Sequence, residues 1–497
     1  MLQRTALDAL HAGDRDLSGS PPLVVDLDGT LLRTDLLYES FALLMRQQPW
    51  LLLLIPFWLL RGGKARLKRE IARRVDLDVG TLPLNRPFLD WVLRQRMDGR
   101  TVVIVSAADQ SLVDRVAADL GFFNEAIGSD GVTNLSGRRK IDAIVDRFGP
   151  DFTYCGDAVT DLHVWDHCRS AVLVGRGTRL ENRLAEDVVV HERFQLEPVN
   201  WRVWLKALRV HQWAKNGLVF VPLLLSGRIW EPGSIGMAAL GALVLSLVAS
   251  ATYLLNDLLD LADDRQHRSK RERPFASGAL PLADGLLAVP VLALAVLVLL
   301  LFTPPAFAAV TVLYLVVTLA YSFRLKRVAN LDLFVLAFLF TVRILAGITL
   351  IEVPASPWLL TFSMFFFLSL AAMKRYTECR ELERGGKSST PGRGYECADH
   401  PWLLAMGAAS GFCATLVFFM YLVDPNSPAQ EFATPGVLWF ICLILGYWLS
   451  TAWLQALRGN MNDDPVLYAL KDKQSRLLGV LTLGLVVAAH VRWLPGA

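Results

Sequence analysis

The chain has 497 residues, of which 53% are hydrophobic and 20% are charged, and its formal net charge is only +3. So small a charge, with no basic tract interleaved with stacking aromatic residues, excludes a typical nucleic-acid-binding protein. The six cysteines include no Cys-x-x-Cys pair, which argues against a zinc site or a disulfide framework and fits a reducing compartment. The length predicts more than one domain.

Residues 1–195 have the composition of a soluble domain and contain four polar motifs. Apolar segments at residues 23–25, 102–105 and 152–155 predict buried strands that alternate with helical segments. Such alternation indicates a parallel sheet whose site lies at the carboxyl ends of the strands. In chain order, the polar residues of the four motifs are Asp26 with Asp28, Ser106, Lys140, and Asp157 with Asp161.

These four motifs, in this order, resemble those of the haloacid-dehalogenase (HAD) superfamily of phosphatases. The resemblance implies an α/β Rossmann-like fold in which Asp26 is the nucleophile that forms an aspartyl-phosphate. Asp28 would protonate the leaving group and then activate water, and Ser106 and Lys140 would bind the phosphoryl oxygens. Phosphoryl transfer needs a metal ion to offset charge, and a carboxylate nucleophile divides it into two steps. The implied Mg²⁺ ligands are Asp26, Asp28, Asp157 and Asp161.

Residues 32–95 separate the first two motifs, and their mostly helical pattern matches an inserted cap. Within them, the apolar run 50–60 is too short to span a membrane, and a cluster of lysines and arginines follows it. An apolar patch flanked by cations suits the membrane interface. The alternative is that this run forms the core of the cap itself. Residues 196–205 are predicted to be a short linker into a membrane domain.

Residues 206–497 are dominated by apolar segments of spanning length. We expect an all-α polytopic domain of about nine transmembrane helices, and eight to ten are compatible with the sequence. The loops after the second, fourth, sixth and eighth apolar segments carry most of the lysines and arginines of the loops in this domain. This asymmetry predicts that these loops and the N-terminal domain lie on the cytoplasmic side of the inner membrane. The segments lie at about 213–231, 235–255, 286–302, 306–322, 331–350, 357–373, 402–423, 435–455 and 477–494.

The end of the second segment carries four regularly spaced oxygen ligands, Asn256, Asp257, Asp260 and Asp264. The spacing is roughly helical, which places their oxygens on one face. Carboxylates are costly at membrane depth, and an oxygen-only cluster suits Mg²⁺ held together with substrate phosphates. A solvated charge run that obeys the positive-inside rule would explain the nearby cations but not the spaced carboxylates.

Further polar residues of the charged loops could bind phosphate oxygens. One face of the membrane would then present metal-binding carboxylates beside cations, above an apolar bundle able to hold a lipid chain. That combination is typical of a site where a phosphate ester or pyrophosphate meets a polyprenyl lipid. The residues concerned are Lys215, His267, Lys270, Arg271, Arg273, Lys326, Lys374, Arg375, Glu378, Arg393 and Tyr395.

The motif Asn-Asp-x-x-Asp-x-x-x-Asp resembles the hallmark of the UbiA superfamily of intramembrane prenyltransferases, over residues 205–497. Three features resemble the branch that transfers phosphoribose to decaprenyl phosphate. They are the stretch from His211 to Asn216, the basic extension from Asp264 to Pro274, and Lys374-Arg375 with Glu378 in place of a second Asp-rich motif. The resemblance implies that Asp257 and Asp260 are catalytic and that a single Mg²⁺ binds the first motif.

We therefore expect a bifunctional membrane enzyme that transfers 5-phosphoribose from phosphoribosyl pyrophosphate to polyprenyl phosphate in a Mg²⁺-dependent step. The HAD-like domain would then remove the 5-phosphate of the lipid-linked product. Two alternatives remain open, namely an aromatic prenyltransferase that uses a polyprenyl diphosphate and a non-enzymatic lipid carrier. The lipid chain length is left open, and an oligomer is compatible with the sequence.

Overall fold

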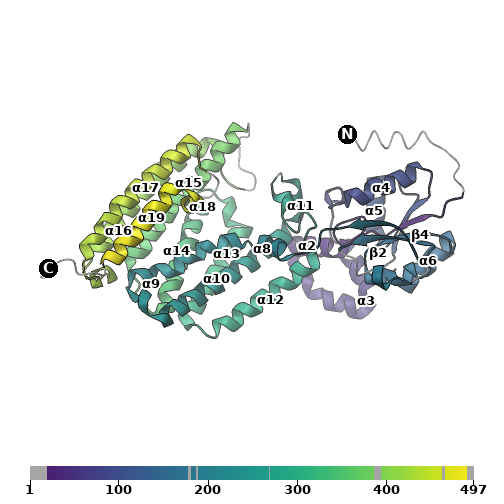
Figure 1. Ribbon diagram of the computed structural model, residues 1–497, viewed down its shortest axis with the longest axis horizontal. Helices are drawn as coiled ribbons and strands as arrows, with labels where there is room; N and C mark the ends of the chain where they lie inside the picture. The colour runs from purple at the N-terminus through teal and green to yellow at the C-terminus, as the bar shows by residue number, and fades with distance from the viewer. Residues whose placement is uncertain are drawn as a thin grey trace. The chain divides into compact units, whose positions relative to one another are not determined.

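The structure is a computed structural model that describes residues 19–176, 181–185, 188–267, 269–385, 393–461 and 465–489. It divides into two compact units (Figure 1). The first unit comprises Met1–Leu208 and Tyr253–Pro290, and the second comprises Arg209–Thr252 and Val291–Ala497. The metal-binding motif predicted at residues 256–264 therefore belongs to the same compact unit as the predicted soluble domain.

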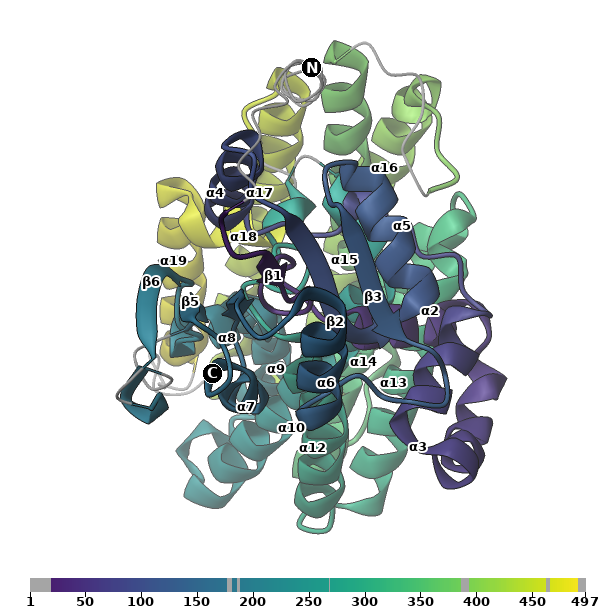
Figure 2. The ribbon, with the colours of Figure 1, turned by 90° about the vertical axis from the view of Figure 1, so that its right-hand side faces the viewer.

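A six-stranded parallel sheet in the order β3-β2-β1-β4-β5-β6 forms the centre of the first unit (Figure 2). On β1, Val24 pairs with Val103 of β2 and with Tyr154 of β4. The strand order reverses beside β1, and ligands of such sheets bind in the crevice at that point. The strands are β1 (Leu23–Val25), β2 (Val102–Asp109), β3 (Glu125–Ser129), β4 (Thr153–Gly156), β5 (Ser170–Gly175) and β6 (Val189–Gln195).

Helices cover both faces of this sheet, which explains why the central strands are continuously apolar. Because side chains alternate along a strand, Leu23 packs with Val113 of α5 in one core, and Val24 packs with Ile144 of α6 in another. The helices of the sheet domain are α4 (Arg86–Met97), α5 (Gln110–Leu120), α6 (Arg138–Phe148), η3 (Val159–Asp161), α7 (Leu162–Trp165) and η4 (Glu181–Arg183). Between β1 and α4 lie α2 (Leu36–Gln47), η1 (Pro49–Leu54), α3 (Ile55–Ala72) and η2 (Val79–Thr81).

Seven helices within the described residues are long and apolar enough to cross a membrane, so the chain is a multi-pass membrane protein. Five of them belong wholly to the second unit. The other two, α10 and α12, are divided between the units: the end of α10 and the beginning of α12 belong to the first. The seven are α10 (Pro232–Leu259), α12 (Leu282–Leu300), α13 (Pro305–Phe323), α14 (Leu331–Ile351), α15 (Pro357–Arg384), α16 (His400–Val423) and α17 (Trp439–Arg458).

The predicted count of nine spanning helices is not confirmed by the described residues. The first predicted span, 213–231, is not one helix but three short ones, η5 (Val210–Phe220), α9 (Val221–Leu225) and η6 (Arg228–Trp230). Pro222 is the second residue of α9, and Gly227, with φ of 70°, precedes η6. The ninth predicted span, 477–494, coincides with α19 (Lys473–Ala489) and extends beyond the last described residue.

Short helices join these elements. The first unit also contains α8 (Trp201–Ala207), where a linker was predicted, and α11 (Leu261–Gln266) with η7 (Lys270–Glu272), which follow α10. In the second unit the remaining helices are η8 (Leu325–Arg327), η9 (Cys397–Asp399), η10 (Pro428–Glu431), η11 (Pro435–Leu438) and α18 (Pro465–Lys471).

Candidate functional site

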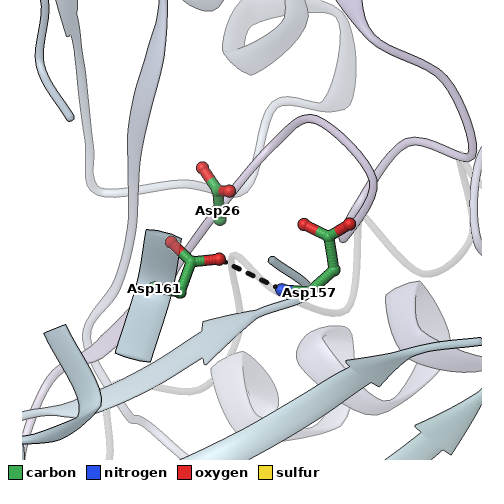
Figure 3. A group of neighbouring side chains, drawn as sticks. All are labelled: Asp26, Asp157 and Asp161. Carbon is green, nitrogen blue, oxygen red and sulfur yellow. Dashed lines mark hydrogen bonds between the residues drawn. The ribbon is translucent and has the colours of Figure 1, made fainter. Parts of the chain in front are cut away.

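Three carboxylates converge at the carboxyl ends of β1 and β4. Asp26 directly follows β1, and Asp157 and Asp161 follow β4; one oxygen of each lies within 4.8 Å of the others (Figure 3). Gly29 has φ of 75°, and a Cβ added there would lie 2.1 Å from Asp157 Oδ2, so the tight turn after β1 requires glycine. The strand ends therefore form an oxygen-only cluster that could hold a divalent cation.

The charge of this cluster is only partly balanced by Lys140 of α6. Its Nζ donates to Asp26 Oδ1 at 2.8 Å and lies 3.8 Å from Asp161 Oδ1. Burial raises the pKa of Asp26 to about 6 and the pKa of Asp157 well above its usual range. Three buried or half-buried carboxylates beside one ammonium group are short of positive charge, and a divalent metal ion is the kind of ligand that would supply it.

The other two predicted residues of this site are placed differently. Asp28 is outside the three-carboxylate cluster, and its Oδ1 accepts a hydrogen bond from the Leu36 amide at 2.9 Å. Burial and the neighbouring Asp35 raise the pKa of Asp28 well above its usual range. Ser106 is buried within β2, and its Oγ accepts from the Ala108 amide at 3.1 Å. The raised pKa of Asp28 favours its protonated form.

The motif at the end of α10 divides into a buried pair and a more exposed carboxylate. Asp257 and Asp264 are buried, and both accept from Arg273 Nη1, at 3.0 and 2.6 Å. Asp260 lies between α10 and α11, and its Oδ1 is 4.0 Å from Arg46 Nη1. The backbone bonds from the Asp260 amide to Asn256 and from the Asp264 amide to Asp260 keep helical spacing through this break. Arg273 supplies the positive charge between two of the predicted metal ligands.

The cations that follow this motif are mostly accessible. Lys270 and Arg271 lie in η7 and are exposed, as is His267 at the end of α11. The His267 Nδ1 contacts the Ser269 amide and hydroxyl, both at 3.3 Å. Exposed cations beside buried carboxylates fit the binding of a large anionic group at this loop.

A buried ion pair joins this motif to α2 within the first unit. Arg265 of α11 donates to Glu39 from Nη2 to Oε1 at 2.5 Å and from Nη1 to Oε2 at 3.1 Å, and both side chains are buried. The Thr34 hydroxyl donates to Glu39 Oε1 at 2.6 Å, and the Thr34 carbonyl accepts from the Gly29 amide at 3.2 Å. This chain of contacts connects the turn after β1 with the end of α10.

We expect Glu39→Gln to lower the free energy of unfolding by about 3 kcal/mol or more, because it leaves the buried charge of Arg265 without a carboxylate. Adding Arg265→Gln should recover much of that loss. Thermal denaturation of the purified full-length variants in detergent measures both effects. The control is Arg46→Gln, which removes an exposed ion pair with Asp263 and should cost ~1 kcal/mol or less. Equal losses from Glu39→Gln and Arg46→Gln would contradict the importance of the buried pair.

In the second unit, the guanidinium of Arg375 in α15 forms ion pairs with two carboxylates. It is buried, and it donates to Asp332 from Nε at 2.5 Å and from Nη2 at 3.0 Å. Its Nη1 donates to Glu378 Oε2 at 2.8 Å, and Arg393 Nη1 lies 3.0 Å from the same oxygen. The Tyr321 hydroxyl donates to Asp332 Oδ1 at 2.7 Å. The structure thus brings Arg375, Glu378 and Arg393 together, as members of one ion-pair network.

The remaining predicted residues of the second unit have varied surroundings. Tyr395 is buried, and its hydroxyl accepts from the Asn330 amide at 2.8 Å, so it orders the loop before α14. Lys215 Nζ lies over the Phe340 ring, 5.9 Å from the centroid. Lys326 lies in η8 and Lys374 in the second half of α15, and both residues are half-buried.

Among the buried charged residues that the sequence analysis does not name are Glu39, Asp332 and Arg343. Glu39 resembles an ordinary helix carboxylate, and Asp332 is a single acid at the start of an apolar helix. Arg343 was detectable as the only cation inside the apolar run 331–350. Its guanidinium donates to Asn216 Oδ1 at 2.9 Å, the Leu339 carbonyl at 2.7 Å and the Tyr314 hydroxyl at 2.8 Å. It forms no ion pair with any residue that the structure describes.

Residues 218–472, about half of the chain, match the model of the UbiA prenyltransferase family. The chain belongs to the UbiA prenyltransferase family. Two rhizobial relatives of this UbiA member are an uncharacterized protein, y4nM, of Sinorhizobium fredii and the nodulation protein NoeC of Azorhizobium caulinodans. The first is 39% identical over 94% of this chain and 91% of its own length, and the second is 38% identical over 59% of this chain and 95% of its own length.

Another relative is the decaprenyl-phosphate phosphoribosyltransferase of Mycobacterium tuberculosis. It is 30% identical over 57% of this UbiA-family chain and 93% of its own length. Among solved structures, a UbiA homologue from Archaeoglobus fulgidus bound to DMAPP and Mg²⁺ aligns with a TM-score of 0.44 at 14% identity, covering 58% of this chain and 98% of that one.

Proposed function

We propose that the UbiA-type part of this chain transfers 5-phosphoribose from phosphoribosyl pyrophosphate to a polyprenyl phosphate, at the cytoplasmic face of the inner membrane. The similarity to decaprenyl-phosphate phosphoribosyltransferases over 57% of the chain is the observation that carries this proposal. The motif at the end of α10, with its buried Asp257–Arg273–Asp264 arrangement and nearby exposed cations, supports it. An anionic donor such as a pyrophosphate matches that charge distribution.

Asn256, Asp257, Asp260 and Asp264 would hold Mg²⁺, whose preferred ligands are oxygens. When bound, the metal neutralises charge on the pyrophosphate leaving group. A phosphate oxygen of the lipid would attack C1 of the ribose while the bond from C1 to the pyrophosphate oxygen breaks. The lipid phosphate is largely ionised at neutral pH, so this step requires no general base. Arg273, Lys270 and Arg271 would bind the phosphates of the donor.

The assignment is tested by incubating the purified full-length protein in detergent with Mg²⁺, radiolabelled phosphoribosyl pyrophosphate and polyprenyl phosphate. We expect label in the lipid fraction, and none when Mg²⁺ is removed with a chelator. Parallel reactions contain a polyprenyl diphosphate with an aromatic acceptor. Prenylation of the acceptor, without ribosylation of the lipid, would favour the aromatic prenyltransferase. Turnover in neither reaction would favour a lipid carrier.

We further propose that the α/β domain is a HAD-type phosphatase. The cluster of Asp26, Asp157 and Asp161, with Lys140 bound to it, supports this proposal. Asp26 would attack phosphorus, and the bond to the substrate oxygen would break as Asp28 donates its proton to that oxygen. Water, deprotonated by Asp28, would then attack the phosphorus of the aspartyl-phosphate and release inorganic phosphate. The raised pKa of Asp28 fits a group that donates a proton first.

The two activities would form one sequence of reactions. Transfer of 5-phosphoribose yields a lipid-linked ribose that still carries a 5-phosphate, and a phosphomonoester is the substrate class of such phosphatases. Because both sites belong to one polypeptide, the lipid product is held at a high effective concentration for the second site. We therefore propose that the α/β domain removes the 5-phosphate from the lipid-linked product.

A further inference from the structure

A group of large apolar side chains is exposed on η1 and the first half of α3. We call these residues the cap patch: Trp50, Leu53, Leu54, Phe57, Leu59 and Leu60. Leu53 is 83% exposed, Leu60 88% and Trp50 64%. Several large apolar side chains exposed within one short segment of a domain indicate a binding surface.

The core of the surrounding helices does not use these side chains. That core consists of Leu44, Trp58, Ile71 and Val75, with partly buried residues such as Leu51 and Ile55 packed against it. The sequence left two alternatives for the apolar run 50–60, a patch for the membrane interface and the core of the cap. Each alternative applies to different residues of the run. Trp58 and its inward neighbours form the core, whereas the cap patch faces outward.

A sharp bend separates the cap patch from the basic half of α3. Gly62 and Gly63 have non-helical backbone angles, and Gly63 has φ of 61°, a conformation that favours glycine. After the bend, Lys68 Nζ donates to the Ala107 carbonyl at 2.6 Å, which ties the second half of α3 to the sheet domain. The basic half of α3 is therefore attached to the sheet domain, whereas the half before the bend buries Trp58 and exposes the cap patch.

The charges around the cap patch favour an anionic partner. No aspartate or glutamate occurs between Glu39 and Glu70, whereas six arginines and lysines do. Arg61 and Lys64, next to the patch, are exposed and form no ion pair with a described residue. The Arg61 guanidinium lies 4.4 Å from the centroid of the Phe57 ring, so cationic and apolar groups adjoin. This combination is typical of segments that lie in the interface of a bilayer.

We propose that the cap patch inserts into the headgroup layer of an anionic membrane, with Arg61 and Lys64 contacting lipid phosphates. A bilayer is the partner always present for this chain, because the chain spans one. The α/β domain would then contact the membrane at a second point, independent of the covalent connection and of whichever reaction each site performs.

Site-directed spin labelling of the full-length protein in phosphatidylcholine–phosphatidylglycerol nanodiscs tests this proposal. Exposed Cys413 is first replaced by serine, and single cysteines are introduced by Leu53→Cys or Leu60→Cys. The matched control is Val132→Cys, an 85% exposed apolar position of the same unit outside the cap patch. We expect labels at 53 and 60 to be several-fold more accessible to oxygen, relative to a water-soluble nickel chelate, than the label at 132.

Equal nickel accessibility at all three positions would overturn the proposal. Spin–spin broadening at 53 and 60 would also overturn it, because a second copy of the chain would then cover the patch. Adding Arg61→Gln and Lys64→Gln should reduce the difference in nanodiscs containing phosphatidylglycerol. A second measurement needs no label: brominated lipids should quench more fluorescence of the wild-type protein than of Trp50→Phe, and equal quenching would count against insertion.

Discussion

Replacing Asp257 by asparagine is expected to reduce transfer to the lipid by about 100-fold or more. The change removes a negative charge from a proposed metal ligand, and the loss of even an outer-shell partner of a metal site costs 10–100-fold. Expression and folding should persist, because asparagine has the same shape and Arg273 keeps Asp264 as its partner at 2.6 Å. Incorporation of labelled phosphoribose into lipid measures the effect.

The matched control for this variant is Asp263→Asn. Asp263 lies in the same segment, but its side chain is 64% exposed and its partner is Arg46. We expect nearly normal transfer from this control, since exposed ion pairs contribute little. Wild-type turnover by Asp257→Asn, with intact protein of the expected yield, would refute the assignment of the transfer site to the end of α10.

Replacing Asp26 by asparagine is expected to lower hydrolysis of small phosphate esters on the order of 10³-fold or more, because the nucleophile is lost. Transfer of phosphoribose should continue. Thin-layer chromatography of the lipid product should show polyprenyl-phosphoryl ribose from the wild-type protein and its 5-phosphate from the variant. Asp142→Asn, at an exposed position on α6, is the control and should behave as wild type.

Three outcomes would separate the proposals for the α/β domain. Normal hydrolysis by Asp26→Asn would refute the phosphatase assignment. Loss of hydrolysis with the same phosphorylated lipid from both proteins would show that the domain acts on another phosphate ester. Loss of lipid transfer as well would show that the two sites depend on each other more closely than we propose.

Much of the fold could be predicted because its signals are local in the sequence. The central strands are continuous apolar segments, and Asp26 and Asp157 of the cluster directly follow β1 and β4. The division of residues 213–231 into short helices could not be predicted, because average hydropathy does not register the effect of Pro222 and Gly227.

The buried ion pairs could not be predicted from the sequence for a different reason. Glu39 and Arg265 are 226 positions apart, and each alone looks like a solvated helix residue. Asp332 and Arg375 are 43 positions apart, and nothing in the sequence indicates that these two residues pair. Burial decides the role of such residues, and burial depends on which elements the fold brings together.

The buried contact between Glu39 and Arg265 has a consequence for the inheritance of this protein. Its two members come from the α/β domain and from the UbiA-type part of the chain. A gene fragment that lost the first domain would encode an arginine whose carboxylate partner is missing, and a substitution at either position would favour a compensating change at the other. We therefore expect the fusion to have been maintained as one reading frame, with positions 39 and 265 changing together among relatives that share both domains.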